Sequence, residues 1–148
     1  MDALRAAVAD AVGQRVERMA VVRGGDVASS FRVDLHDGTH LFAKTHPAPP
    51  AGFFTTEAAS LSWLRDAAAV AIPSVVAVSD GAGSAPAFLV LEWIEAGRPG
   101  PSTERALGTA LAALHDAGAP CFGRDDRRTT GSRGLPNDPQ PDWPAFYG

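Results

Sequence analysis

Apolar residues recur along the chain with two different periods. Residues 2–12 and 54–69 place them three and four positions apart, which is the spacing of a helix with one apolar face. Residues 29–36 alternate strictly between apolar and polar, as a half-buried strand does. The pattern predicts helices over 2–12 and 54–69, strands over 16–22, 29–36, 39–45, 74–79 and 86–94, and a last helix capped by Ser102.

Glycine-rich segments separate the predicted elements. Asp37-Gly38 is typical of a tight hairpin turn, residues 80–84 join the last two strands, and residues 95–101 form a linker before the last helix. The predicted order is therefore helix, three strands, helix, two strands and helix.

A glycine pair lies between the first two predicted strands. Gly24 and Gly25 either only turn the chain or allow backbone N–H groups to approach phosphate oxygens. Asp26 follows them, and we expect it to cap or orient this loop, because a carboxylate repels phosphate.

Composition limits the class of function. The 148 residues are 45% hydrophobic and 20% charged, which fits one globular domain. A net charge of −4 argues against nucleic acid or an anionic membrane as the partner. Cys121 is the single cysteine, so no internal disulfide is expected, and no apolar run is long enough for a secretory signal or a membrane span. We expect a cytoplasmic protein.

The last part of the chain is rich in glycine, proline and aromatic residues. Asp142 is a suitable helix cap, and Trp143, Phe146 and Tyr147 would share one face of a single turn. An exposed aromatic face needs something to pack on. This pattern predicts that the sequence is the opening part of a longer protein.

Lys44 is the only lysine among thirteen basic residues. It lies near the end of the third predicted strand, and Glu57 lies on the apolar stripe of the next helix. A carboxylate on such a stripe needs either solvent or a cation. The two residues are either an unrelated surface lysine and rim glutamate, or an ion pair. The order of glycine loop, strand lysine and helix glutamate favours the pair.

Several short motifs occur in a fixed order. They are Gly24–Asp26 (GGD), Phe42–Lys44 (FAK), Phe54–Leu64, Leu91–Ile94 (LEWI), Leu107–His115, Phe122–Gly123, Gly131–Ser132 and Asp142–Tyr147. Together they resemble the first part of the fructosamine kinase (ketosamine-3-kinase) family of protein-kinase-like phosphotransferases. Each motif is loose, but their order and spacing over nearly the whole chain are fairly specific.

The resemblance implies an α+β fold, a protein-kinase-like small lobe with a five-stranded antiparallel sheet and an inserted helix, followed by a hinge, a helix and a linker. Residues 1–94 would form the ATP-binding lobe and residues 95–148 the linker, helix and start of a second lobe. The implied activity is ATP-dependent phosphorylation of a sugar hydroxyl on glycated amines or proteins. Another small-molecule kinase of the aminoglycoside or choline kinase type, or a non-catalytic nucleotide-binding fragment, is the alternative.

The resemblance also implies roles for single residues. Lys44 would contact the α- and β-phosphates of ATP, and Glu57 would hold it by an ion pair. The loop of Gly24, Gly25 and Asp26 would cover the phosphates. The hinge would be Glu92, Trp93 and Ile94, offering the Glu92 carbonyl and the Ile94 amide to adenine, with Leu91 lining the pocket. His115 is expected to be structural.

The family's catalytic loop, of the form HGDxxxxN, does not occur in this sequence. His36-Asp37-Gly38 has similar letters in the wrong order and lies in a hairpin turn. Neither a catalytic residue nor a magnesium ligand is therefore assigned to the chain; the Mg²⁺ ligands are expected in the rest of the enzyme. We expect the chain by itself to be inactive and to bind nucleotide weakly.

Overall fold

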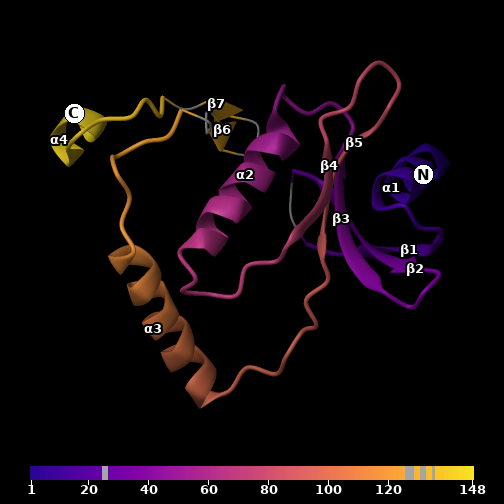
Figure 1. Ribbon diagram of the computed structural model, residues 1–148, viewed down its shortest axis with the longest axis horizontal. Coiled ribbons are helices and arrows are strands. Elements are labelled where there is room, and N and C mark those ends of the chain that lie inside the picture. The colour runs from indigo at the N-terminus through magenta and orange to yellow at the C-terminus, as the bar shows by residue number, and fades with distance from the viewer. Residues whose placement is uncertain (25–26, 126–128, 131–132, 135) are drawn as a thin grey trace. The chain divides into compact units, whose positions relative to one another are not determined.

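The computed structural model describes residues 1–24, 27–125, 129–130, 133–134 and 136–148. In chain order the elements are α1 (Asp2–Val12), β1 (Val16–Val22), β2 (Ser29–Leu35), β3 (His40–His46), α2 (Phe53–Asp66), β4 (Val75–Ser79), β5 (Ala87–Glu92), α3 (Pro101–Asp116), β6 (Thr129–Thr130), β7 (Arg133–Gly134) and α4 (Trp143–Tyr147) (Figure 1). Spatial contacts divide the chain into two units. One unit comprises Met1–Ala58 and Pro73–Ile94, and the other Ala59–Ile72 and Glu95–Gly148. The boundary after Ile94 stays a prediction.

The first unit is built around a five-stranded sheet. Its strand order is β1-β2-β3-β5-β4, and every neighbouring pair is antiparallel. The helix α2 is inserted between β3 and β4 in the chain. The predicted five-stranded antiparallel sheet with an inserted helix is confirmed. In its register Lys44 on β3 lies between Ser30 on β2 and Leu89 on β5.

One face of this sheet carries the main hydrophobic core. The helix α1 packs against β1, β4 and β5 (Figure 1), and its Leu4 and Val8 join the core. The sheet contributes Val16, Phe31, Val33, Leu35, Leu41, Ala43, Phe88 and Val90 to the same cluster. Because neighbouring side chains on a strand point to opposite faces, Phe42 and Lys44 point away from this core.

The opposite face of the sheet is also partly buried. Leu89 is fully buried, although its neighbours Phe88 and Val90 belong to the core on the first face. Phe54 and Ala58 at the start of α2 are buried as well. The side of β3 that presents Lys44 is therefore sheltered rather than fully exposed to solvent.

The second unit has little buried surface among its described residues. None of the residues of α3 is buried, and its Leu107 and Leu111 are 53% and 41% exposed. In α4 the Asp142 carboxylate accepts a hydrogen bond from the Ala145 amide at 2.9 Å, so the predicted cap is confirmed.

Two predicted helix ends are wrong. The helix α2 ends at Asp66 rather than near residue 69, because Ala68 adopts a left-handed conformation with φ of 51°. The cap of α3 is Gly100 rather than Ser102, which lies inside the helix. The Thr103 hydroxyl accepts a hydrogen bond from the Gly100 amide at 2.9 Å and secures this earlier start. No helix among the described residues is long and apolar enough to cross a membrane.

Candidate functional site

Lys44 and Glu57 form an ion pair. Lys44 Nζ lies 2.7 Å from Glu57 Oε1 and 2.9 Å from Oε2, so the ammonium bonds both carboxylate oxygens. The two side chains are only 25% and 31% exposed. This shelter from water makes the attraction stronger than in a fully exposed pair. Of the two arrangements that the sequence left open, the structure has the paired one.

A pocket lies on the sheet face that carries Lys44. It has a volume of about 340 Å³ and is lined by Val22, Phe42, Pro73, Leu91, Glu92, Trp93 and Ile94. Phe42 precedes Lys44 by two positions on β3, so both side chains emerge on the same face. Small-molecule sites are typically concave, mostly apolar and about 300–1,000 Å³. The lining and the volume fit a flat aromatic ring system.

The end of β5 is fixed at the edge of this pocket. The Glu92 amide donates to the Ser74 carbonyl at 2.9 Å, and the Glu92 carboxylate accepts from the Ser74 amide at 3.1 Å and from its hydroxyl at 2.8 Å. These bonds hold the segment that continues into Trp93 and Ile94. The predicted contacts of the Glu92 carbonyl and the Ile94 amide with adenine stay predictions.

Arg32 contacts one wall of the pocket. Its guanidinium lies over the Trp93 ring, 5.4 Å from the ring centroid. The same group donates to Asp34 Oδ1 at 2.8 Å and to His40 Nε2 at 2.9 Å. We did not predict this residue. The alternation of β2 placed Arg32 on the polar face, but no local pattern linked it to Trp93.

The glycine loop is only partly described. Gly24 has φ of 122°, a conformation that side chains disfavour, and nothing lies within 4 Å of the position that a Cβ would take. Glycine is therefore required there by the backbone conformation and not by crowding. Gly25 and Asp26, which were also predicted for this site, lie outside the described residues.

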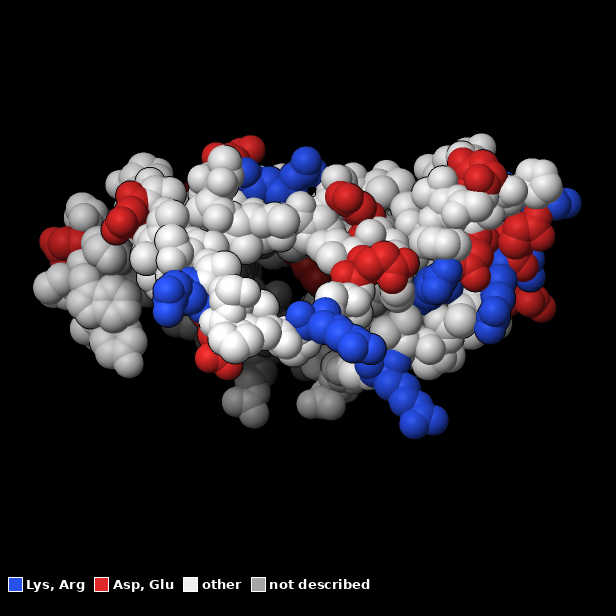
Figure 2. Space-filling view, turned by 90° about the horizontal axis from the view of Figure 1, so that it is seen from below, with Lys and Arg blue, Asp and Glu red and all other residues white. Residues whose placement is uncertain are grey.

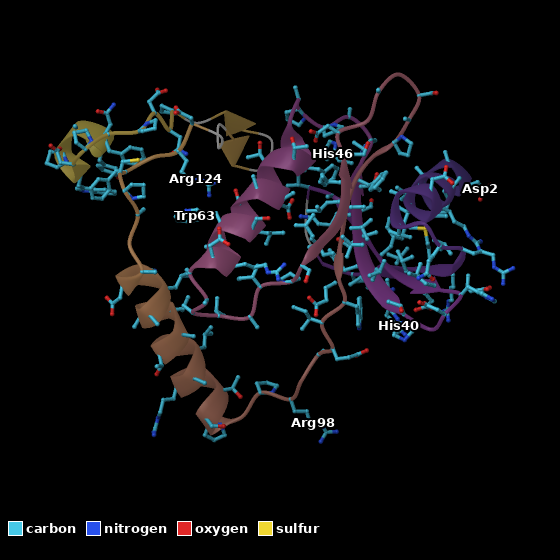
Figure 3. All side chains as sticks on the ribbon, viewed as in Figure 1. Asp2, His40, His46, Trp63, Arg98 and Arg124 are labelled. Atoms are coloured by element: carbon cyan, nitrogen blue, oxygen red, sulfur yellow. The ribbon has the colours of Figure 1, made fainter. Side chains whose placement is uncertain are left out.

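The second unit contains one further contact that we did not predict. Arg124 lies over the ring of Trp63, with 4.7 Å to the ring centroid (Figure 3).

Within the described residues, no three His, Cys, Asp or Glu side chains gather as a metal site would require. Basic and acidic side chains are interspersed over the face drawn in Figure 2.

The strand order, the inserted helix and the pairing of a strand lysine with a helix glutamate define the small lobe of a protein-kinase-like fold. Comparison with known proteins narrows this class. The model of the family described as fructosamine kinase matches residues 1–148. The chain belongs to the fructosamine kinase family.

Individual relatives agree with this assignment. A protein of Enterococcus faecium, named a probable ketoamine kinase, is 36% identical over 126 residues, which are 85% of this chain and 43% of the relative. A crystal structure from Thermobifida fusca, assigned as a fructosamine-3-kinase, has 31% identity and a TM-score of 0.85 over 99% of this chain and 50% of that one. A Haemophilus somnus structure with the same assignment, at 21% identity and a TM-score of 0.78 over 97% of this chain and 48% of that one, supports the fold. The chain spans about half the length of these proteins or less.

Proposed function

We propose that this chain supplies the ATP-binding lobe of an enzyme that phosphorylates a sugar hydroxyl on glycated amines or proteins. Membership in the fructosamine kinase family supports an ATP-dependent phosphotransferase. The observation that carries the proposal is the Lys44–Glu57 ion pair, because it lies on the same sheet face as the apolar pocket. A cation and an apolar pocket on one face suit a ligand that has both phosphates and an aromatic base.

The residues of the chain fit such a ligand. Adenine would enter the pocket above Phe42 and Leu91, which lie side by side on the sheet, with the backbone of Glu92 to Ile94 at its edge. Lys44 would meet the α- and β-phosphates as a compact point charge, and Glu57 would keep its ammonium on this face. Gly24 and the residues after it would cover the phosphates.

The proposal gives the two parts of the chain different roles. In this proposal residues 1–94 bind the nucleotide, and residues 95–148 provide the linker and the first part of the second lobe. No catalytic base and no Mg²⁺ ligand is assigned to this chain, so we expect that it does not transfer phosphate alone. The cytoplasmic location stays a prediction.

The test uses the protein expressed from the complete reading frame. ADP formation is followed with MgATP and fructosyl-lysine, and with aminoglycoside, choline and homoserine as competing acceptors. We expect turnover of the ketosamine and a loss of about 100-fold or more in Lys44→Met, because an electrostatic contact to the reacting phosphates is removed. Lys44→Arg, which keeps the charge, is the matched control and should lose less.

Two results would contradict the proposal. Turnover of another acceptor in preference to the ketosamine would overturn the substrate, and ketosamine turnover that Lys44→Met leaves unchanged would overturn the role of the pair.

A further inference from the structure

A carboxylate from a distant turn caps the helix that carries Glu57. Asp80 Oδ1 accepts hydrogen bonds from the Phe54 amide at 2.8 Å and from the Thr55 amide at 3.3 Å. Asp80 Oδ2 accepts a third from the Thr55 hydroxyl at 2.6 Å. Asp80 follows β4, so these bonds join the end of one strand to the first turn of α2 across 26 positions of sequence.

The start of α2 lacks a side chain of its own that could make these bonds. The residue before the helix is Gly52, where a Ser, Thr, Asp or Asn cap would normally stand. The Phe53 amide donates to the Pro50 carbonyl at 3.2 Å, and the Thr56 amide donates to the Gly52 carbonyl at 2.9 Å. The amides of Phe54 and Thr55 lie between these two. Among the described contacts, only Asp80 accepts hydrogen bonds from them. A helix start without such partners is disfavoured.

The turn that presents Asp80 has a required shape. Gly81 has φ of 76°, and a Cβ there would lie 2.8 Å from the Ala85 carbonyl oxygen, so only glycine fits without a shift of the backbone. The Gly81 amide donates to the Ser79 hydroxyl at 3.1 Å. Asp80 is thus held between two constrained residues rather than carried on a loose loop.

Glu57 lies two positions after Thr55, the second of the two residues that Asp80 caps. It lies three positions after Phe54, less than one helical turn from the bonds of Asp80, and its carboxylate meets Lys44. Rotation or fraying of the first turn would move the Glu57 carboxylate away from β3. The ring of His46, at the end of β3, lies 5.7 Å from that of Phe53, which again places the start of α2 beside this strand (Figure 3).

We propose that Asp80 is a positioning residue for the Lys44–Glu57 ion pair. By fixing the first turn of α2 it sets the place of Glu57, and through Glu57 the place of the Lys44 ammonium. The consequence for nucleotide binding rests on the proposed function, whereas the geometric effect on Lys44 does not. The two can therefore be tested separately.

The single lysine of the chain gives a direct readout. When the 148-residue chain is labelled with ¹³C,¹⁵N-lysine, one side-chain ammonium signal reports on Lys44 alone. In Asp80→Ala we expect the chemical shift of this signal to move towards that of a free lysine. We also expect the Lys44 side chain to become less ordered. Asp80→Asn keeps an oxygen that can accept from the Phe54 amide, and it should restore much of the wild-type signal.

Asp37→Ala is the matched control for a general loss of stability. Asp37 also accepts from one backbone amide, of Thr39 at 2.9 Å, and from one side chain, of Gln14 at 3.0 Å, but it lies in the β2–β3 turn. We expect Asp37→Ala to leave the Lys44 signal in place. In the protein from the complete reading frame, Asp80→Ala should raise KM for MgATP about fivefold, the size expected for a lost helix cap.

An unchanged Lys44 signal in folded Asp80→Ala would overturn the proposal, as would an equal change in Asp37→Ala. If Asp80→Ala does not fold, Thr55→Val decides, because it leaves both amide bonds to Asp80 and removes the hydroxyl bond to Asp80, together with the longer bond of 3.3 Å from the same hydroxyl to the Gly52 carbonyl. A smaller shift of the Lys44 signal in the same direction supports the proposal, and no shift overturns it. A wild-type Lys44 signal that does not respond to saturating MgATP would instead count against the proposed function, while the ligand-free comparison still decides the role of Asp80.

Discussion

The two faces of the five-stranded sheet carry different kinds of residue. On the face covered by α1, β3 places Leu41 and Ala43 in a core where their exposed fractions are 6% and 0%. On the other face the same strand places Phe42 beside an apolar pocket and Lys44 in an ion pair. Alternation along one strand thus separates residues that stabilise the fold from residues that we propose bind nucleotide. Substitutions on the two faces should have separable effects.

The largest effect on stability is expected on the core face. Leu41→Ala removes a buried side chain and should lower the free energy of unfolding by about 2–5 kcal/mol, from lost burial and the cavity left behind. Denaturant unfolding measures this loss. The affinity of the remaining folded protein for MgATP should stay nearly unchanged, and an affinity that falls with the stability would contradict the separation of the two faces.

The largest effect on the proposed activity is expected three residues further along β3. Lys44→Met should lower the free energy of unfolding by less than about 1 kcal/mol, because the partly exposed Glu57 can still reach water. In the complete protein it should nevertheless reduce turnover about 100-fold or more. Equilibrium unfolding and ADP release, measured on the same preparation, check both parts. A loss of several kcal/mol in stability would assign Lys44 to the fold.

A smaller effect is expected where Arg32 contacts the pocket wall. Arg32→Gln removes the cation over Trp93, and a contact of this kind contributes about 0.5–1 kcal/mol at exposed sites. We therefore expect the Kd for MgATP to rise about two- to fivefold, as calorimetry can measure. Arg98→Gln, in the linker, is the matched control and should change the Kd little (Figure 3). Equal effects of both substitutions would show that only net charge matters.

The smallest effect is expected at the hairpin between β2 and β3, which lies away from both faces of the sheet. Hydrogen bonds from the Thr39 amide, which has the larger effect, and from the Gln14 side chain hold the pKa of Asp37 below the ordinary value of an aspartate. Its contribution to stability is therefore present above that value and is lost as the pH falls through the lowered pKa. Asp37→Asn should flatten the acid side of the Tm-against-pH curve, and a curve of unchanged slope would contradict this.

Local patterns were sufficient for the strands, and they favoured the Lys44–Glu57 pair without deciding it. The alternation of β2 and the hairpin at Asp37-Gly38 predict the strand that carries Lys44, but an acid on an apolar helical stripe needs either solvent or a cation. The arrangement of the strands in one five-stranded sheet was implied by the family resemblance. The ends of α2 and α3 were less predictable. They depend on the left-handed conformation of Ala68 and on a bond between Gly100 and Thr103, which the apolar spacing does not encode.

The remaining parts of the site depend on contacts between distant positions. Gly52 before α2 indicates that the helix needs a cap from elsewhere, but nothing in the sequence points to Asp80, 26 positions after Phe54. Likewise, β2 shows that Arg32 is on the polar face, yet its contact with Trp93 appears only once the chain is folded.

The most direct test of the proposed nucleotide-binding face is a titration of the 148-residue chain labelled with ¹³C,¹⁵N-lysine and ¹⁵N-tryptophan, followed at the Lys44 ammonium and at the Trp93 indole N–H. Millimolar MgATP should shift both signals, because the base would enter the pocket and the phosphates would reach Lys44. Adenosine, which lacks phosphates, should shift Trp93 alone. A Lys44 signal that stays unmoved while MgATP saturates the Trp93 response would contradict the assignment of Lys44 as the phosphate-binding cation.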